Sequence, residues 1–140
     1  MYILDTDLLT LAFQGRGDDA TQLKKRLAQV SRNEVATTIV NYEEQMRGWL
    51  SFAAKAKDVS GLVDAYRKLE KYLVDFKHIP LLSFSEAAAV EFQRLRKSVR
   101  IGTMDLRIAA VALTLDATVL LRNLKDFEKV PGLKVEDWSA

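Results

Sequence analysis

The sequence has 140 residues, about half of them apolar, and its 21 Lys and Arg against 19 Asp and Glu leave a formal net charge of +2. This length predicts one compact domain over residues 1–140, and a charge so close to neutral does not by itself indicate nucleic-acid binding. The absence of Cys, the single His and the lack of a long apolar run exclude a disulfide framework, a typical zinc site, a paired-His nuclease and a membrane span, and with no visible signal peptide we expect a cytoplasmic protein.

The first part of the chain alternates segments typical of strands with segments of helical spacing. Residues 1–5 predict a short buried strand, and the β-branched run Val35–Val40 predicts a second strand. Between them we expect a short helix over Leu8–Phe13, which ends near Gly15, and another helix that begins at Asp18.

Two consecutive helices after the second strand predict a helical-hairpin arm. Met46, Trp49 and Ala53 have helical spacing in the first helix, and the second runs from about Val59 to Phe76. The expected elements that follow are a strand over 79–83, helices over 85–98 and 103–115, a strand over 117–121, a helical turn over 123–127 and a strand over 133–136. Strands separated by helices predict a three-layer α/β/α fold with a central, mostly parallel sheet of four to five strands. His78 is expected at a strand edge.

Acidic side chains gather near the ends of the predicted strands. They are Asp5 and Asp7 after the first strand, Glu43 and Glu44 after the second, Asp126 after the fourth, and Asp105 in the first turn of the helix before the fourth. Ligands of open α/β sheets bind at the carboxyl ends of the strands, so these acids can meet at one edge. Carboxylates held together repel one another, and a divalent cation relieves that repulsion. With no Cys and one His, Mg²⁺ or Mn²⁺ is the expected cation.

Each acid taken alone also has an ordinary interpretation as part of a helix cap. Asn41 with Glu44, and Asn123 with Asp126, have the spacing of a capping box. Asp105 follows a plausible cap at Thr103, and Asp5 itself can cap the helix that follows it. Spacing alone therefore does not establish that the acids converge.

Four blocks of sequence stand in a recognisable order: Tyr2–Asp7, Thr38–Gly48, Ile101–Ala110 and Leu121–Phe127, with Val130–Leu133 and Glu136–Trp138 after them. Together they resemble the PIN-domain family, particularly the VapC-type toxin ribonucleases of bacterial type II toxin–antitoxin pairs. The resemblance covers nearly the whole chain. It implies a PIN-like domain, an endoribonuclease that depends on Mg²⁺ or Mn²⁺, an RNA substrate, a cognate antitoxin protein and a homodimer.

The resemblance also implies roles for individual side chains. Asp5, Glu44, Asp105 and Asn123 match the family's four catalytic positions, and Asp5, Glu44, Asp105 and Asp126 are the implied metal ligands. Glu44 is preferred over Glu43 because of its distance to Gly48. Two positions depart from the family's pattern: Asp7 stands where Asn or Ser is common, and Leu121 stands where Thr or Ser is frequent.

The implied reaction is in-line attack of a metal-bound water on an RNA phosphodiester. Supporting side chains that would orient the ligands are Thr6, Asp7, Thr103 and Glu43. Candidates for contacts with RNA phosphates are Arg94, Arg96, Lys97, Arg100, Arg107 and Arg122, although such a group is also typical of a solvated helix face. Trp49, Leu50 and Phe52 either pack in the core or form a groove that receives an antitoxin helix.

Two alternatives remain on the sequence alone. An apolar strand followed by Asp-x-Asp also resembles the start of a haloacid-dehalogenase-like phosphatase, in which Asp5 would be a nucleophile and Asp7 an acid and base. That family needs a closing acidic pair after a later strand, and none is evident. The second alternative is a PIN-like binding module without catalysis, against which the filled acidic positions argue.

Overall fold

Five parallel strands form one sheet in the order β3-β2-β1-β4-β5. The computed structural model describes all 140 residues, and the strands are β1 (Tyr2–Leu4), β2 (Val35–Thr38), β3 (Leu81–Leu82), β4 (Thr118–Leu120) and β5 (Lys134–Glu136). Strand β1 is central, and its Ile3 pairs with Ala36 of β2 and Val119 of β4. Because every pairing is parallel, all five carboxyl ends lie at the same edge of the sheet. The predicted α/β fold is confirmed.

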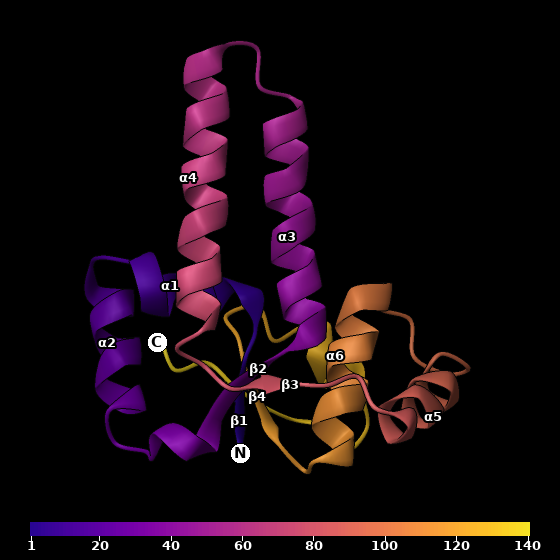
Figure 1. The fold of residues 1–140 in the computed structure, drawn as a ribbon. Coiled ribbons are helices and arrows are strands. Elements are labelled where there is room, and N and C mark those ends of the chain that lie inside the picture. Colours follow the sequence, from indigo (N-terminus) through magenta and orange to yellow (C-terminus); the bar gives the residue numbers. More distant parts are fainter.

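Helices cover both faces of the sheet and two of them extend beyond it. They are α1 (Thr6–Gln14), α2 (Asp18–Leu27), α3 (Ile39–Ala54), α4 (Val59–Phe76), α5 (Glu86–Leu95) and α6 (Thr103–Thr114). Figure 1 shows α1 and α2 on one side of the sheet, α5 and α6 on the other, and α3 and α4 rising side by side as the predicted arm. None of these helices has both the length and the apolar character required to cross a bilayer.

The core consists of two layers that follow from the alternation of side chains along the strands. Ile3 and Val119 point to the face covered by α5 and α6, where Ile108 lies among the buried side chains. Leu4 and Leu120, the next residues along each strand, point to the opposite face and pack with α1, α2 and the buried ring of Trp138. Both central strands are therefore apolar on two sides, as expected for a parallel sheet between two helical layers.

Strand β2 ends at Thr38, earlier than the predicted boundary at Val40, because a helix cap intervenes. The Thr38 hydroxyl accepts a hydrogen bond from the Asn41 backbone N–H at 3.1 Å, and the Asn41 Oδ1 accepts one from the Thr38 backbone N–H at 3.3 Å. This reciprocal capping box begins α3 at Ile39. The capping box that the spacing predicts between Asn41 and Glu44 is therefore wrong.

Three other local predictions also differ from the structure. The helical turn expected over 123–127 is a short 3₁₀ turn at Phe127–Lys129, held by the buried ring of Phe127. The Asn123 side chain accepts from the Lys125 N–H and not from that of Asp126, so the second predicted capping box is absent. Helix α6 begins after Gly102, with Thr103 as its first residue and not its cap.

The arm is held together by aromatic side chains near its base. The ring of Trp49 on α3 lies 5.4 Å from that of Tyr72 on α4, and Tyr42 meets Phe76 edge to face at 5.0 Å, measured between ring centroids. Leu50 and Phe52 are 54% and 50% exposed, so the core-packing interpretation fails for them, and Trp49 is partly buried against Tyr72 within the arm.

Candidate active site

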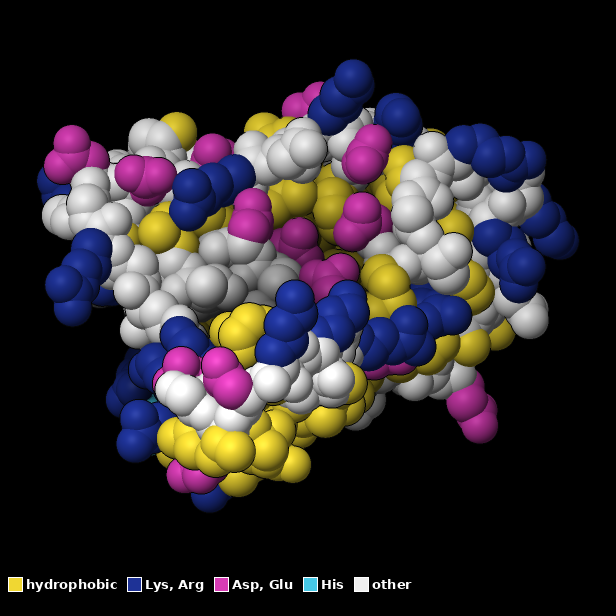
Figure 2. All heavy atoms as spheres, turned by 90° about the horizontal axis from the view of Figure 1, so that it is seen from above, with side chains coloured by type: hydrophobic (Ala, Val, Ile, Leu, Met, Phe, Trp, Pro, Cys, Tyr) yellow, Lys and Arg dark blue, Asp and Glu magenta, His cyan; other side chains and the backbone are white.

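Four acidic side chains come together at the carboxyl edge of the sheet. Asp5 follows β1 directly, Glu44 lies on α3, Asp105 lies in the first turn of α6, and Asp126 lies in the segment after β4. Figure 2 looks along the arm and shows acidic side chains gathered in a hollow of this face, with Lys and Arg side chains around it. The sheet topology thus brings together acids that are far apart in the sequence.

Burial and mutual repulsion raise the pKa values of two of these acids. The pKa of Asp5 rises from 3.8 to about 7, chiefly because the carboxyl is buried, and the charges of Asp7 and Glu44 add to the rise. The backbone N–H of Thr6 and the side chain of Asn41 oppose it. Burial also raises the pKa of Asp105, with smaller contributions from Glu44 and Asp126. Glu44 therefore lies close enough to interact with both Asp5 and Asp105.

A buried amide that sequence reasoning treated only as a helix cap contacts the central acid. The Asn41 Nδ2 donates to Asp5 Oδ1 at 2.8 Å and to the Thr6 hydroxyl oxygen at 3.2 Å. The Thr6 hydroxyl in turn donates to Glu44 Oε1. The signal in the sequence was Asn41 itself, three residues after the last strand residue and three before Glu44, but local spacing does not reveal a contact across 36 residues.

The two neighbouring glutamates have different surroundings. Glu43 forms an ion pair with Arg47 one turn along α3, at 2.6 Å, whereas Glu44 accepts from Thr6 and faces the other acids. Consecutive helix positions point about 100° apart, so only one of the two can face the sheet edge. This geometry favours Glu44 as the acid of the site, as the resemblance implies.

Asn123 and Asp126, the two candidate site residues after β4, also have different surroundings. Asn123 is exposed, and its side-chain oxygen accepts from the Lys125 backbone N–H at 3.4 Å. Asp126 is half-buried and forms an ion pair with Lys129 at 3.5 Å. Its charge contributes to the raised pKa of Asp105. The arrangement thus brings Asp126 to the acids more directly than Asn123.

Asp7 is exposed, and its carboxylate accepts hydrogen bonds from backbone N–H groups. Its Oδ1 accepts from the Leu8 N–H at 2.7 Å, and its Oδ2 accepts from the Arg122 N–H at 3.2 Å, which ties the start of α1 to the end of β4. Thr103 is exposed at the start of α6. Leu121, where the family often has a hydroxyl, is buried in the core, so packing takes the place of that polar group.

The donor set suits a hard divalent cation, because it consists of oxygen atoms and because its carboxylates repel one another when ionised. No group of three or more Asp, Glu or His side chains, however, already stands in an arrangement that would hold a metal ion. The residues fit the cation by the chemistry of their oxygen donors.

The candidate RNA contacts fall into two groups. Arg107 lies over the ring of Phe92 at 5.7 Å and borders a hollow of about 450 Å³ with Glu43, and Arg122 pairs with Asp19 at 3.2 Å. The remaining basic residues lie at the end of α5 and the segment after it: Arg94, paired with Glu91, and Arg96, Lys97 and Arg100, all exposed. Arg122 donates its backbone N–H to Asp7, and Arg107 lies on α6 two residues after Asp105.

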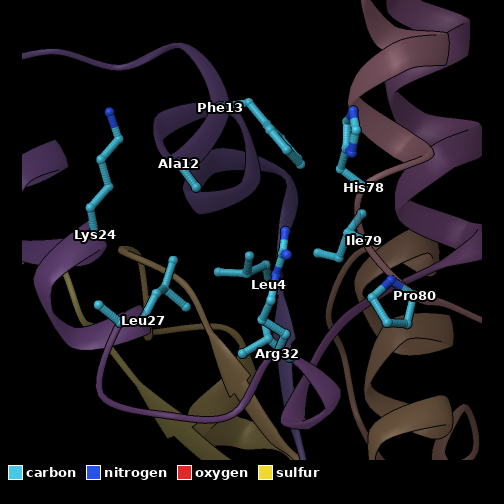
Figure 3. Close-up of a pocket in the computed structure, with 11 residues that line it drawn as sticks. Leu4, Ala12, Phe13, Lys24, Leu27, Arg32, His78, Ile79 and Pro80 are labelled. Atoms are coloured by element: carbon cyan, nitrogen blue, oxygen red, sulfur yellow. The ribbon is translucent and has the colours of Figure 1, made fainter.

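Two further cavities lie near the arm. One, of about 340 Å³, borders the acids and is lined among others by Thr6, Glu44, Trp49 and Phe52. The other, of about 320 Å³, lies between α1, α2 and the end of α4 (Figure 3) and has apolar walls with Lys24, Arg32 and His78 at its border. His78 lies in the turn after α4 and not at a strand edge as predicted. No acid lines this second cavity, so it is separate from the candidate site.

Comparisons with known proteins agree with this arrangement. The PIN domain model matches residues 2–133. The chain is 27% identical to Ribonuclease VapC2 of Rickettsia felis, over 99% of this chain and 98% of that protein.

Solved structures are similar over the same extent. A crystal structure of VapBC2 from Rickettsia felis, bound to a DNA fragment from its promoter, superposes with a TM-score of 0.72 at 25% identity and covers 98% of each chain. A structure of VapBC-1 from nontypeable Haemophilus influenzae has the same fold, with a TM-score of 0.75 at 23% identity over 99% of this chain and 98% of that one. A family match over nearly the whole length, on a fold that gathers the expected acids at one edge, shows that this chain belongs to the PIN domain family.

Proposed function

We propose that this protein is an endoribonuclease that depends on Mg²⁺ or Mn²⁺ and acts as the toxin of a type II toxin–antitoxin pair. The observation that carries the proposal is the position of Glu44, which is linked to Asp5 through the hydrogen bonds of Thr6 and Asn41 and whose charge acts on both Asp5 and Asp105. The similarity to a protein named as a ribonuclease, over nearly the full length of both chains, supports the same activity. Family membership also leaves the phosphatase alternative without a basis.

In the proposed reaction, Asp5, Glu44 and Asp105 would hold the cation, and Asp126 or Asn123 would hold a ligand water or a second ion. When bound, the cation supplies a Lewis acid for the scissile phosphate and lowers the pKa of the attacking water. The Thr6 hydroxyl holds one oxygen of Glu44, and Asn41 holds one oxygen of Asp5. Arg107 and Arg122 would contact the RNA backbone, which is a contribution that does not depend on base sequence.

The proposed antitoxin would bind the exposed apolar part of the arm. Leu50 and Phe52 on α3 present large apolar side chains to solvent, and Phe52 borders the cavity beside Glu44. A partner helix that packs on these residues would cover the approach to the acids. The similarity to VapBC2 of Rickettsia felis supports a partner of this kind.

Cleavage of RNA by matched variants tests the enzymatic proposal. The purified protein should cut RNA internally with Mg²⁺ or Mn²⁺, and EDTA should stop the reaction. Asp5→Asn, Glu44→Gln and Asp105→Asn should each lower the rate roughly 100-fold or more, because loss of a ligand should exceed the 10- to 100-fold effect of losing an outer partner.

Glu43→Gln is the control, since it removes the adjacent charge, which pairs with Arg47. Its rate should stay within a few-fold of the wild type. Equal loss in Glu43→Gln and Glu44→Gln would contradict the assignment of Glu44. Full activity in Asp5→Asn and Asp105→Asn would mean that another nuclease contaminates the preparation and that this protein is a binding module without catalysis.

A further inference from the structure

Asn41 is the most enclosed polar side chain at the candidate site. It has no exposed surface, and all of its hydrogen-bonding groups have partners. Its Oδ1 accepts from the backbone N–H of Thr38 at 3.3 Å and from the Thr38 hydroxyl at 2.7 Å, and its Nδ2 donates to Asp5 and to Thr6. A buried amide with two accepted and two donated bonds has one preferred orientation.

Thr38, at the start of α3, determines which way the Asn41 amide points. Because Thr38 supplies two donors to Oδ1, the opposite end of the amide, which carries the two Nδ2 hydrogens, must face Asp5 and Thr6. The Thr6 hydroxyl oxygen accepts from Asn41, so its own hydrogen is available for Glu44, to which it donates. One hydrogen-bonded chain therefore runs from Thr38 through Asn41 to Asp5, and through Thr6 to Glu44.

These inward bonds are not needed to cap the helix. The capping box uses the backbone N–H groups of Thr38 and Asn41, the Thr38 hydroxyl and the Asn41 Oδ1. The Nδ2 group takes no part in it. An amide also suits this place because it is a neutral donor, whereas a carboxylate would add charge 2.8 Å from Asp5 and a lysine ammonium would compete with a bound cation.

We infer that Asn41 is a positioning residue, which fixes the orientations of Asp5 and Glu44 so that both carboxylates face one cation. This inference rests on the proposed function, and it adds a residue that acts through the acids and does not touch the RNA. Asn41 thereby couples the start of the arm to the metal-binding acids, because the cap that begins α3 also orients the amide.

The test compares two buried amides on the same helix. Asn41→Leu keeps the branching at Cγ with a somewhat larger side chain and removes both Nδ2 donors, and Asn41→Ser is a smaller polar variant that cannot reach Asp5. Gln45→Leu is the matched control, because Gln45 is also buried on α3 and donates to Thr10 at 2.9 Å, without contact to an acid of the site. Circular dichroism and thermal melting check that each variant is folded.

Calorimetric titration with MnCl₂ gives a measurement that is independent of activity. Both Asn41 variants should bind Mn²⁺ about tenfold or more weakly, within the range typical of outer partners of metal ligands, and Gln45→Leu should keep the wild-type affinity. At saturating Mn²⁺, kcat for RNA cleavage should fall in the Asn41 variants, while KM for RNA should stay within about twofold, since Asn41 does not touch the substrate.

The outcomes separate this inference from the proposed function. If the wild type binds Mn²⁺ and cuts RNA, and a folded Asn41 variant keeps wild-type affinity and kcat, the positioning role is wrong and the nuclease remains. If Asn41 and Gln45 variants lose affinity equally, α3 has only a structural role. If the wild type neither binds Mn²⁺ nor cuts RNA, the proposed function itself fails.

Discussion

The surroundings of Asp5 act on its protonation in two opposite ways when no metal is bound. Its carboxyl is largely buried next to other acids, which favours the protonated form, and yet it accepts a hydrogen bond from Asn41, which favours the charged form. A buried carboxylate near a second acid is unfavourable unless a cation joins them. The conflict at Asp5 is therefore the residue-scale feature from which the proposed metal binding is argued.

This conflict predicts a pH-dependent gain in stability for Asp5→Asn without metal. The pKa of Asp5 is about 7 in the folded protein against 3.8 as the ordinary value, so between these pH values the folded state binds more protons than the unfolded state. The free energy of unfolding of the wild type must then fall as the pH rises through this interval. Asp5→Asn lacks that loss and should be more stable at pH 8 by roughly 1–4 kcal/mol, since one pKa unit corresponds to about 1.4 kcal/mol.

Urea unfolding in EDTA, followed by tryptophan fluorescence at pH 4 and pH 8, measures this difference. Asp64→Asn, on the exposed surface of α4, is the control and should show no gain that grows with pH. Added Mn²⁺ should reverse the order of wild type and Asp5→Asn, because only the wild type keeps the ligand. A stability difference that stays constant from pH 4 to pH 8 would contradict the account of Asp5.

The sequence could identify the acids but not their contacts. The resemblance favours Glu44 over Glu43, which is one helix position away, and the structure adds that Glu43 pairs with Arg47. Asn41 was assigned to a local cap, because its contact with Asp5 depends on the pairing of β1 with β2. The spacing of residues along the sequence does not predict contacts that depend on how distant strands pair.

At the scale of elements, α3 serves both the sheet and the arm. Its first two turns supply Asn41 and Glu44 at the sheet edge, and its later turns carry Trp49, which packs on Tyr72 of α4. The strong helical spacing made the arm predictable, including the limits of α4. The boundary between β2 and α3 was harder, because Ile39 and Val40 are β-branched and their strand preference is overridden by the Thr38–Asn41 cap.

The exposed part of the arm gives a prediction about the antitoxin. Leu50→Glu and Phe52→Glu should each weaken binding of the cognate antitoxin about tenfold or more, because each places a charge on an apolar contact surface. Val90→Glu is the control, since Val90 is 68% exposed but lies on α5, away from the arm. Calorimetry with the purified antitoxin measures the affinities. Equal weakening by Val90→Glu, or none by the arm variants, would place the partner elsewhere.

At the scale of the whole molecule, the parallel sheet is what makes the site. Strand β1 lies between β2 and β4, so the segments that follow these three strands meet at one edge, and α6 adds Asp105 from the neighbouring layer. Alternating strands and helices were sufficient to predict this class of fold. The strand order and the short lengths of β3 and β5 depend on tertiary packing, which the local pattern does not determine.

The central claim is that Asp5, Glu44 and Asp105 hold one catalytic cation. Anomalous diffraction at the manganese edge, from crystals soaked in MnCl₂, tests it most directly. The account predicts a peak within ligand distance of Asp5 and of at least one of Glu44 and Asp105, and no such peak in crystals of Asp5→Asn. Manganese bound only elsewhere on a protein that cuts RNA with Mn²⁺ would contradict it.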